Sequence, residues 1–361
     1  MLTKETMDMK RIAAITEAGA ISGSERPVTR LMKEALTGYA DEFDYDNQGS
    51  LICIKHGNGK GPRVMLSSHT DEIGFIVNKI EPSGILRIMS PSGWWTHTLL
   101  GQEVLIHTEE KGDVLGLIGT HFPDEDTDKG RVRKMSELYV DTGVRGREKV
   151  EALGIKRGDT VTLNVQFKEM ADPDVMMAKA WDDRVGVNII TDVMKELKGV
   201  EHDCELFVCG TVQEEVGYRG GKTCGYRVHP DISITVDVAK CDDFPGCEEE
   251  GHKLQGGVVI RHYDSKVLGN QELSRFIQKA GRDLGYPVDI IVQNYGGGEA
   301  HEIHRLFDGV VTICLSVPSL YILSPRALVH KDRYVAMVNT LVEVIKRLTM
   351  EDLERFKESR R

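Results

Sequence analysis

Short apolar runs that lead into polar, metal-capable residues recur along this chain. Runs of four to eight apolar residues bounded by polar residues are typical of buried strands. Three such runs are residues 64–68 before His69, residues 206–210 before Glu214 and Glu215, and residues 232–236 before Asp237. Because open α/β sheets build their sites beyond the carboxyl ends of their strands, these side chains are predicted to meet at one sheet edge.

Two further segments carry a helical pattern. The pair Asp182-Asp183 precedes apolar residues at helical spacing, namely Val185, Ile189, Ile190, Val193 and Met194. Residues 24–27 are predicted to cap another helix, which continues to Leu36. Residues 51–54 are predicted to form a strand, which a glycine-rich turn joins to the strand ending before His69.

The pattern changes between residues 74 and 167, where β-like runs become short and frequent. These runs are residues 74–80, 86–88, 103–107, 114–118 and 160–167, with turn residues between them. Such spacing predicts a small β-barrel or sandwich. We therefore expect an inserted β-rich domain at residues 74–167, between two parts of a main domain at residues 1–73 and 168–361.

Two features of this insert lead to predictions. Trp94 and Trp95 are adjacent, and we expect one to pack in the core of the insert and the other to anchor an interface. Residues 121–134 carry mixed charges and are predicted to form a mobile loop that reaches over a neighbouring site.

Composition and charge narrow the class of protein. The 361 residues, 40% of them hydrophobic, suffice for a sizeable core in one large domain and a smaller one. A formal net charge of −11 argues against non-specific binding to nucleic acid, which needs a basic surface. The seven cysteines are irregularly spaced and form no C-x-x-C motif, which indicates free thiols in a reducing cytoplasm. We expect neither a signal peptide nor a membrane span, because the first ten residues are charged and no long apolar stretch occurs.

The acidic pairs suggest metal chemistry. Successive side chains on a strand point to opposite faces, so one of Glu214 and Glu215 can bind an ion while the other holds a water. Buried carboxylates are costly without a cation beside them. Each remaining residue also has an ordinary explanation: Asp182 as a helix N-cap, His69 as a core histidine and Asp237 as a turn residue. Their recurrence at strand ends favours a shared metal site.

Three segments around these residues resemble one known family. They are HTDEIGF at residues 69–75, KAWDDRVG at 179–186 and VQEEVGYRGG at 212–221. The chain resembles the glutamyl and tetrahedral aminopeptidases, a group of co-catalytic di-metal metallopeptidases, over nearly its whole length. This resemblance implies a mixed α/β sheet flanked by helices, with an inserted small β-barrel-like domain. Some members carry an endoglucanase label, but adjacent carboxylates within a metal motif do not suit an acid pair that must flank a glycosidic bond.

The resemblance implies a role for each candidate residue. The metal ligands would be His69 and Asp237 on one ion, Glu215 on the second ion, and Asp182 bridging both. Glu214 would be the general base, which takes a proton from water and passes it to the leaving amine. Asp71 would orient the imidazole of His69.

Cofactor, activity and assembly follow from the same resemblance. It implies two divalent ions per chain, and the ligand types favour zinc while remaining compatible with cobalt or manganese. The implied activity is removal of amino-terminal residues from peptides by a metal-activated water. The chains would form dimers through the insert, or twelve subunits in a hollow tetrahedron. Two other functions stay open, an N-acyl amino acid deacylase and a catalytically impaired metal-binding homologue.

Two segments depart from the family pattern. The family's last metal ligand is a histidine near the C-terminus, but the best-aligned residue here is Leu323. The family's G-G-T-D-A segment is G-G-G-E-A at residues 296–300. On sequence spacing His330 is the first candidate for a replacement ligand, followed by His301 and His304. The competing interpretation gives all three histidines ordinary surface roles, and the second ion is then expected to bind weakly.

Overall fold

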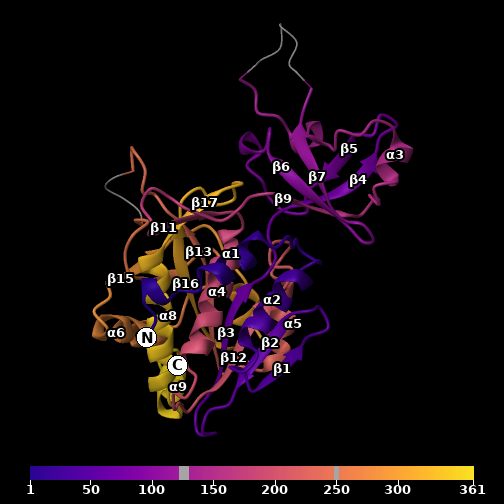
Figure 1. Cartoon of the computed structure of the whole chain (residues 1–361). Coiled ribbons are helices and arrows are strands. Elements are labelled where there is room, and N and C mark those ends of the chain that lie inside the picture. The colour runs from indigo at the N-terminus through magenta and orange to yellow at the C-terminus, as the bar shows by residue number, and fades with distance from the viewer. Residues whose placement is uncertain (122–129, 248–251) are drawn as a thin grey trace.

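A mixed β-sheet carries the strand ends that the sequence predicts. The computed structural model describes residues 1–121, 130–247 and 252–361 (Figure 1). Within these residues the strands of the sheet lie in the order β1 (Glu42–Tyr45), β2 (Leu51–Lys55), β12 (Glu205–Thr211), β3 (Arg63–His69), β13 (Ile232–Lys240), β16 (Val311–Ser319), β14 (Val258–Tyr263) and β15 (Val288–Val292). The central strands β12, β3, β13 and β16 are parallel, so their carboxyl ends share one edge.

Helices cover both faces of this sheet. The larger core packs against α1 (Met9–Glu17), α2 (Arg26–Leu36), α4 (Trp181–Glu196), α6 (Gln271–Asp283), α8 (Lys331–Arg347) and α9 (Met350–Glu358), and the smaller core packs against α5 (Arg219–Val228) and α7 (Ala300–Ile303). Side chains of a strand alternate between faces. On β12, for example, Leu206 and Val208 belong to the larger core, and Phe207 and Cys209 belong to the smaller one.

Helix α4 is buried on nearly all sides rather than on one stripe. The helices α1 and α8 both pack against it, which encloses polar side chains as well as apolar ones. Arg11 on α1 donates to both carboxylate oxygens of Asp192 on α4, at 2.5 and 2.7 Å, and the hydroxyl of Tyr334 on α8 donates to Asp192 at 2.7 Å. This buried ion pair joins the three helices.

The chain after β3 forms a separate closed barrel, which stands to one side of the main sheet (Figure 1). Its strands follow the order β4 (Phe75–Ile80), β5 (Leu86–Met89), β8 (Tyr139–Asp141), β7 (Gly112–Gly119), β6 (Glu103–Thr108) and β9 (Thr160–Leu163). The barrel has a core of its own, to which Phe75, Val104 and Val140 contribute. Trp94 stacks on Phe75 with ring centroids 5.1 Å apart, whereas Trp95 is 56% exposed.

Several short elements complete the described structure. A small sheet holds β10 (Lys168–Glu169), β11 (Val175–Ala178) and β17 (Ala327–His330). The remaining helices are α3 (Arg147–Glu151) and the 3₁₀ turns η1 (Lys4–Thr6), η2 (Thr96–Thr98) and η3 (Met135–Glu137). In the described part of the chain, no helix combines the length and the apolar character needed to cross a membrane.

The structure confirms the predicted fold class and corrects its details. Strands β2 and β3 are not neighbours, because β12 lies between them and pairs with both. The apolar pattern missed β8, which is only three residues long. The domain boundaries at 74 and 167 stay a prediction, and residues 122–129 of the predicted loop lie outside the described residues.

Candidate active site

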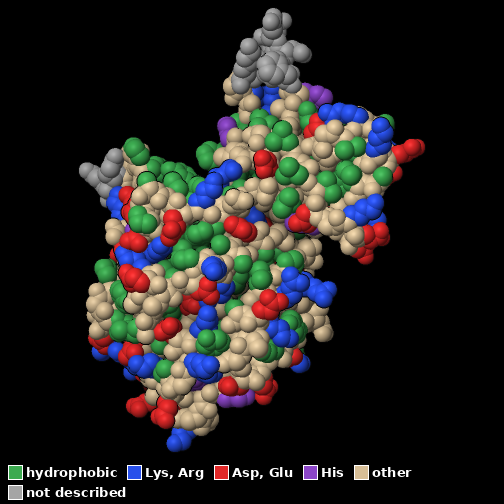
Figure 2. All heavy atoms as spheres, in the orientation of Figure 1, with side chains coloured by type: hydrophobic (Ala, Val, Ile, Leu, Met, Phe, Trp, Pro, Cys, Tyr) green, Lys and Arg blue, Asp and Glu red, His purple; other side chains and the backbone are tan. Residues whose placement is uncertain are grey.

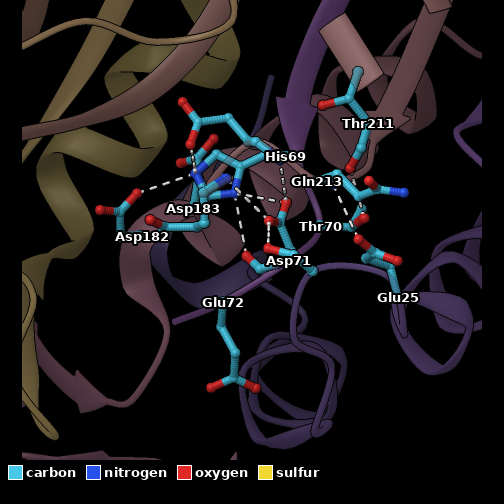
Figure 3. A network of polar contacts seen from close by, with 12 residues as sticks. Glu25, His69, Thr70, Asp71, Glu72, Asp182, Asp183, Thr211 and Gln213 are labelled. Carbon is cyan, nitrogen blue, oxygen red and sulfur yellow. Dashed lines mark hydrogen bonds and ion pairs between the residues drawn. The ribbon is translucent and has the colours of Figure 1, made fainter. Parts of the chain in front are cut away.

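The polar ends of parallel strands meet at one edge of the main sheet. His69 ends β3 and lies beside Thr211, the last residue of β12. The acidic residues predicted to join it follow β12, lie on β13 or begin α4, and they are Glu214, Glu215, Asp237, Asp182 and Asp183. Figure 3 shows His69 among the carboxylates of Asp71, Asp182 and Asp183. The side chains expected at the strand ends therefore lie together in the structure.

His69 is the centre of this group. Its Nε2 lies 3.1 Å from Asp182 Oδ1 and 4.0 Å from Glu214 Oε2. Its Nδ1 lies 3.1 Å from the backbone oxygen of Asp71 and 3.4 Å from Asp71 Oδ1. Burial alone would lower the pKa of His69, but the carboxylates of Glu214, Asp182 and Asp71 outweigh burial and hold it well above its usual range. Nε2 therefore faces the carboxylates of Asp182 and Glu214, and Nδ1 is held by Asp71.

Asp71 also fixes the loop that carries the acidic pair. Its Oδ1 accepts a hydrogen bond from the backbone N–H of Glu214 at 3.0 Å, and its Oδ2 accepts one from Glu215 at 3.1 Å. The hydroxyl of Ser22 donates to Oδ2 at 2.6 Å. Burial opposes the charge of Asp71, but His69 and these donors lower its pKa below the usual value.

Glu214 and Glu215 are both largely buried, and burial raises the pKa of each well above its usual range. One ligand atom each from His69, Asp182 and Glu215 lies within 4.8 Å of the others. Among the described residues no group donates a hydrogen bond to Glu215 Oε1, although this atom is buried. We call these three residues the Glu215 cluster. They offer one imidazole nitrogen and two carboxylates, a donor set that suits zinc.

A second cluster, the Asp237 cluster, contains His69, Asp183 and Asp237 within the same distance limit. Its carboxylates already have protein donors. Asp183 Oδ2 accepts from the Ser68 hydroxyl at 2.5 Å, and its Oδ1 accepts from the backbone N–H of Gly186 at 3.2 Å. Asp183, for which the resemblance implied no ligand role, therefore stands where a second group of ligands would form.

Arg261 is a residue of this site that sequence reasoning missed. It lies on β14, and its Nη1 is 3.2 Å from Asp237 Oδ2. The signal was present, since arginine is almost never fully buried without a partner and this one interrupts an apolar strand. Glu25 was also missed as a site residue. It is the N-cap of α2, and its side chain accepts from the backbone N–H groups of Gly23 and Gln213 instead of capping the helix.

Glu299, which lies in the altered glycine-rich segment at residues 296–300, has a structural role. This buried carboxylate accepts hydrogen bonds from the hydroxyls of Ser67 on β3 and Thr211 on β12, each at 2.5 Å. Burial raises the pKa of Glu299, while the two hydroxyls lower it and so oppose that shift. Glu299 thus ties together the two strand ends that carry the candidate site.

A cavity of about 470 Å³ is lined by some members of each cluster. Residues that line it include Asp182, Glu214, Glu215, Asp237, Tyr218, Arg261 and Leu323. Leu323, the residue aligned with the family's last histidine ligand, is thus part of the wall of this cavity. None of the three candidate histidines is among the described residues that line this cavity.

The contacts of these histidines support ordinary roles. His330 caps α8, where its Nδ1 accepts from the backbone N–H of Asp332 at 3.1 Å. His301 packs edge-on against the ring of Tyr218, and His304 Nδ1 lies 2.9 Å from the backbone oxygen of Ala300. A replacement ligand from among them is therefore not favoured.

Comparison with known proteins adds the family. The pattern of the M42 glutamyl aminopeptidase family matches residues 49–340. The chain belongs to this family. Among curated relatives, the putative aminopeptidase FrvX of Escherichia coli (strain K12) is 28% identical, over 98% of this chain and 99% of that protein.

Solved structures of TET peptidases share the fold. The TET aminopeptidase of Thaumarchaeota archaeon SCGC AB-539-E09 is 33% identical, with a TM-score of 0.91 over 96% of this chain and 99% of that chain. The TET1 peptidase of Pyrococcus horikoshii is 26% identical, with a TM-score of 0.84 over 94% and 99%, and can assemble into a tetrahedron or a large octahedral shell. These comparisons confirm the predicted fold class and an aminopeptidase hydrolase, and they do not favour the deacylase or the impaired homologue.

Proposed function

We propose that this chain is a metal-dependent aminopeptidase in which the Glu215 cluster holds a catalytic divalent ion and Glu214 is the general base. The observation that carries the proposal is the grouping of ligand atoms from His69, Asp182 and Glu215 within 4.8 Å of one another. Glu214 lies directly beside this cluster, with its Oε2 4.0 Å from His69 Nε2.

The residues of the Glu215 cluster fit a divalent ion. Glu215 Oε1 is buried and, within the described chain, has no hydrogen-bond donor, which is costly unless a cation satisfies it. The Nδ1 of His69 is held by Asp71, which leaves Nε2 as the coordinating atom. An outer carboxylate that orients a metal-binding histidine is a common device in such sites. Zinc suits these nitrogen and oxygen ligands, and cobalt or manganese also fits them.

The side chains around the ion perform the proton transfers. A bound divalent ion polarises a carbonyl and lowers the pKa of a bound water to about 7. Glu214 takes the proton of the attacking water on its carboxylate and returns it to the amine that leaves the peptide. Asp71 keeps Glu214 in place through its backbone N–H, at 3.0 Å. Because Glu214 is 10% exposed, little solvent competes for this proton.

Self-assembly through the barrel is part of the proposal. The outer face of the barrel exposes large apolar side chains, which include Met89, Trp95, Leu100, Leu115 and Leu117. Figure 2 shows hydrophobic side chains at the surface of the barrel. Where exposed apolar side chains form a contiguous patch they mark an interaction site, and this is the role we propose for these side chains. The assembly into closed shells by the Pyrococcus horikoshii relative supports the same role for this surface.

A reducing compartment such as the cytoplasm also remains our proposal. The seven cysteines are free thiols in the structure, and all but Cys247 are buried. Disulfides form and persist in oxidising environments, so a chain with this many unpaired thiols suits a reducing one.

The function is tested with matched substrates. Purified protein loaded with Zn²⁺ or Co²⁺ is given a short peptide with a free amino terminus, the same peptide after N-acetylation, and N-acetyl amino acids. We expect stepwise release of residues from the free peptide only, and loss of activity on chelation. Hydrolysis of the N-acetyl amino acids alone would show a deacylase instead.

A further inference from the structure

A buried arginine faces the acidic cavity from β14. The side chain of Arg261 is 5% exposed, and its Nη1 lies 3.2 Å from Asp237 Oδ2 and 3.9 Å from Asp264 Oδ2. Its Nη2 donates to the backbone oxygen of Val238. The guanidinium is therefore fixed against the wall of the cavity that Asp237 forms.

The two clusters differ in what their carboxylates already bind. Asp237 Oδ1 accepts a hydrogen bond from its neighbour's backbone N–H at 2.7 Å, and Oδ2 accepts one from Arg261. Both oxygens of Asp183 also accept hydrogen bonds, as described above for Ser68 and Gly186. Glu215 Oε1, by contrast, has no donor among the described residues. The open ligand oxygen thus lies on the Glu215 side.

Charge separates the clusters further. A guanidinium cannot be deprotonated in proteins, so Arg261 brings a permanent positive charge to Asp237. Burial raises the pKa of Asp237, and the charge of Arg261 opposes that shift. A divalent ion bound to Asp237 would lie next to this fixed charge, and repulsion between like charges is strong in a partly buried site. The ion would have to displace the buried Arg261 from Asp237, which would leave it only the more distant carboxylate of Asp264, 3.9 Å away, and the backbone oxygen of Val238.

Two departures from the family pattern concern this cavity. A Cβ atom at Gly298, where the family has threonine, would lie 2.7 Å from Asp237 Oδ2, which is closer than such contacts allow. Gly298 thus leaves room for Asp237 in the orientation that pairs with Arg261. Leu323, at the position of the family's last histidine ligand, lines the same cavity and offers no ligand atom.

We propose that Arg261 takes the place of a second cation in this cavity, so that the chain holds a single divalent ion between His69, Asp182 and Glu215. The location of that ion rests on the proposed function, but the number of ions does not depend on the activity. Arg261 balances the charge of Asp237 permanently, and Asp237 has a positioning role instead of binding an ion.

Ion counting on the wild-type protein tests this proposal without any variant. The protein is stripped with a chelator, dialysed against buffered Zn²⁺ or Co²⁺, and its metal content is measured by plasma mass spectrometry. We expect one ion per chain at saturation, and two tightly bound ions would overturn the proposal. One ion without peptidase activity would contradict the proposed function and leave the inference standing, whereas two ions with activity would do the reverse.

Paired substitutions locate the ion. Glu215→Gln should lose most of the bound ion, while Asp237→Asn should keep it, with folding of both checked by circular dichroism and thermal melting. A folded Asp237→Asn protein that loses its ion as completely as Glu215→Gln would contradict the proposal. The double variant Arg261→Met/Leu323→His should gain a second ion, and its failure to do so would also count against the proposal. Lys240→Met is the matched control, because Lys240 lines the same cavity but pairs with Asp242.

Discussion

The two halves of the cavity contain the same residue types but differ in the hydrogen-bond partners of their carboxylates. On one side the carboxylate of Glu215 keeps a buried oxygen for which the described chain provides no donor. On the other side Asp237 has both oxygens engaged, one of them by Arg261. A carboxylate at a strand end therefore shows where a ligand can lie, but its other partners decide whether it is available to a metal ion.

The largest expected effect concerns Glu214, which lies beside the Glu215 half. Glu214→Gln should lower kcat by about 10²–10⁴-fold, because general-base catalysis contributes that much. Metal content should stay at the wild-type level, since Glu214 is not a proposed ligand. Steady-state kinetics combined with metal analysis checks both points. Loss of the ion in this variant would instead make Glu214 a ligand.

A second buried arginine–aspartate pair sharpens the comparison. Arg11 contacts both oxygens of Asp192, far from any role in metal binding, whereas Arg261 contacts a single oxygen of Asp237. Arg11→Met should lower the free energy of unfolding by about 3–5 kcal/mol, because it leaves a buried charge without its partner. Its ion content should not change.

Urea unfolding measures this loss, and Arg145→Met provides the control. Arg145 pairs with Asp141 on the surface, with its side chain 64% exposed. Removing an exposed pair of this kind costs roughly 0–1 kcal/mol. Equal losses for the two variants would contradict the structural role assigned to the Arg11 pair.

Asp71 holds both His69 and the backbone N–H of Glu215, two members of the Glu215 cluster, and should therefore affect ion affinity. Asp71→Asn should weaken ion binding by about 10–100-fold, the usual cost of losing a carboxylate that orients a metal ligand. Ser22→Ala removes just one of the donors to Asp71 and should have a smaller effect in the same direction. Competition with a chromogenic chelator measures both affinities. Unchanged affinity in Asp71→Asn would remove Asp71 from the site.

The smallest effect on the cavity is expected from the barrel. Leu115, on β7, is 55% exposed, so Leu115→Glu should leave folding and metal content nearly unchanged. It should nevertheless reduce the size of the assembly, because a charge in an apolar interface must be desolvated. Light scattering measures the mass in solution. A wild-type protein that is monomeric at working concentration would contradict assembly through this surface.

Much of this site could be predicted because buried strands can be recognised from short apolar runs. The runs before His69 and Asp237 identified two strands, and the parallel pairing of these strands in the structure brings the polar residues at their ends to one edge. The order of the strands could not be predicted in the same way. Strand β12 lies between β2 and β3 and pairs with both, through contacts between residues that are distant in sequence. No turn motif in the sequence indicates these contacts.

Long-range partners explain the remaining differences. Sequence spacing suggested His330 as a ligand. Spacing alone does not determine where a side chain points, and the side chain of His330 caps α8 instead. Arg261 was missed because its carboxylate partner Asp237 lies on β13, which is not a neighbour of β14 in the sheet. Which carboxylates are open to an ion depends on such contacts and not on residue type.

Peptidase rate as a function of bound metal tests the central claim most directly. Metal-free protein receives Zn²⁺ or Co²⁺ in steps, and release of the first residue from a peptide with a free amino terminus is followed at each step. We expect the rate to rise linearly and to reach its plateau at one ion per chain, with little activity in Glu214→Gln at the same metal content. A plateau only at two ions per chain, or no hydrolysis of the peptide at any metal content, would contradict the central claim.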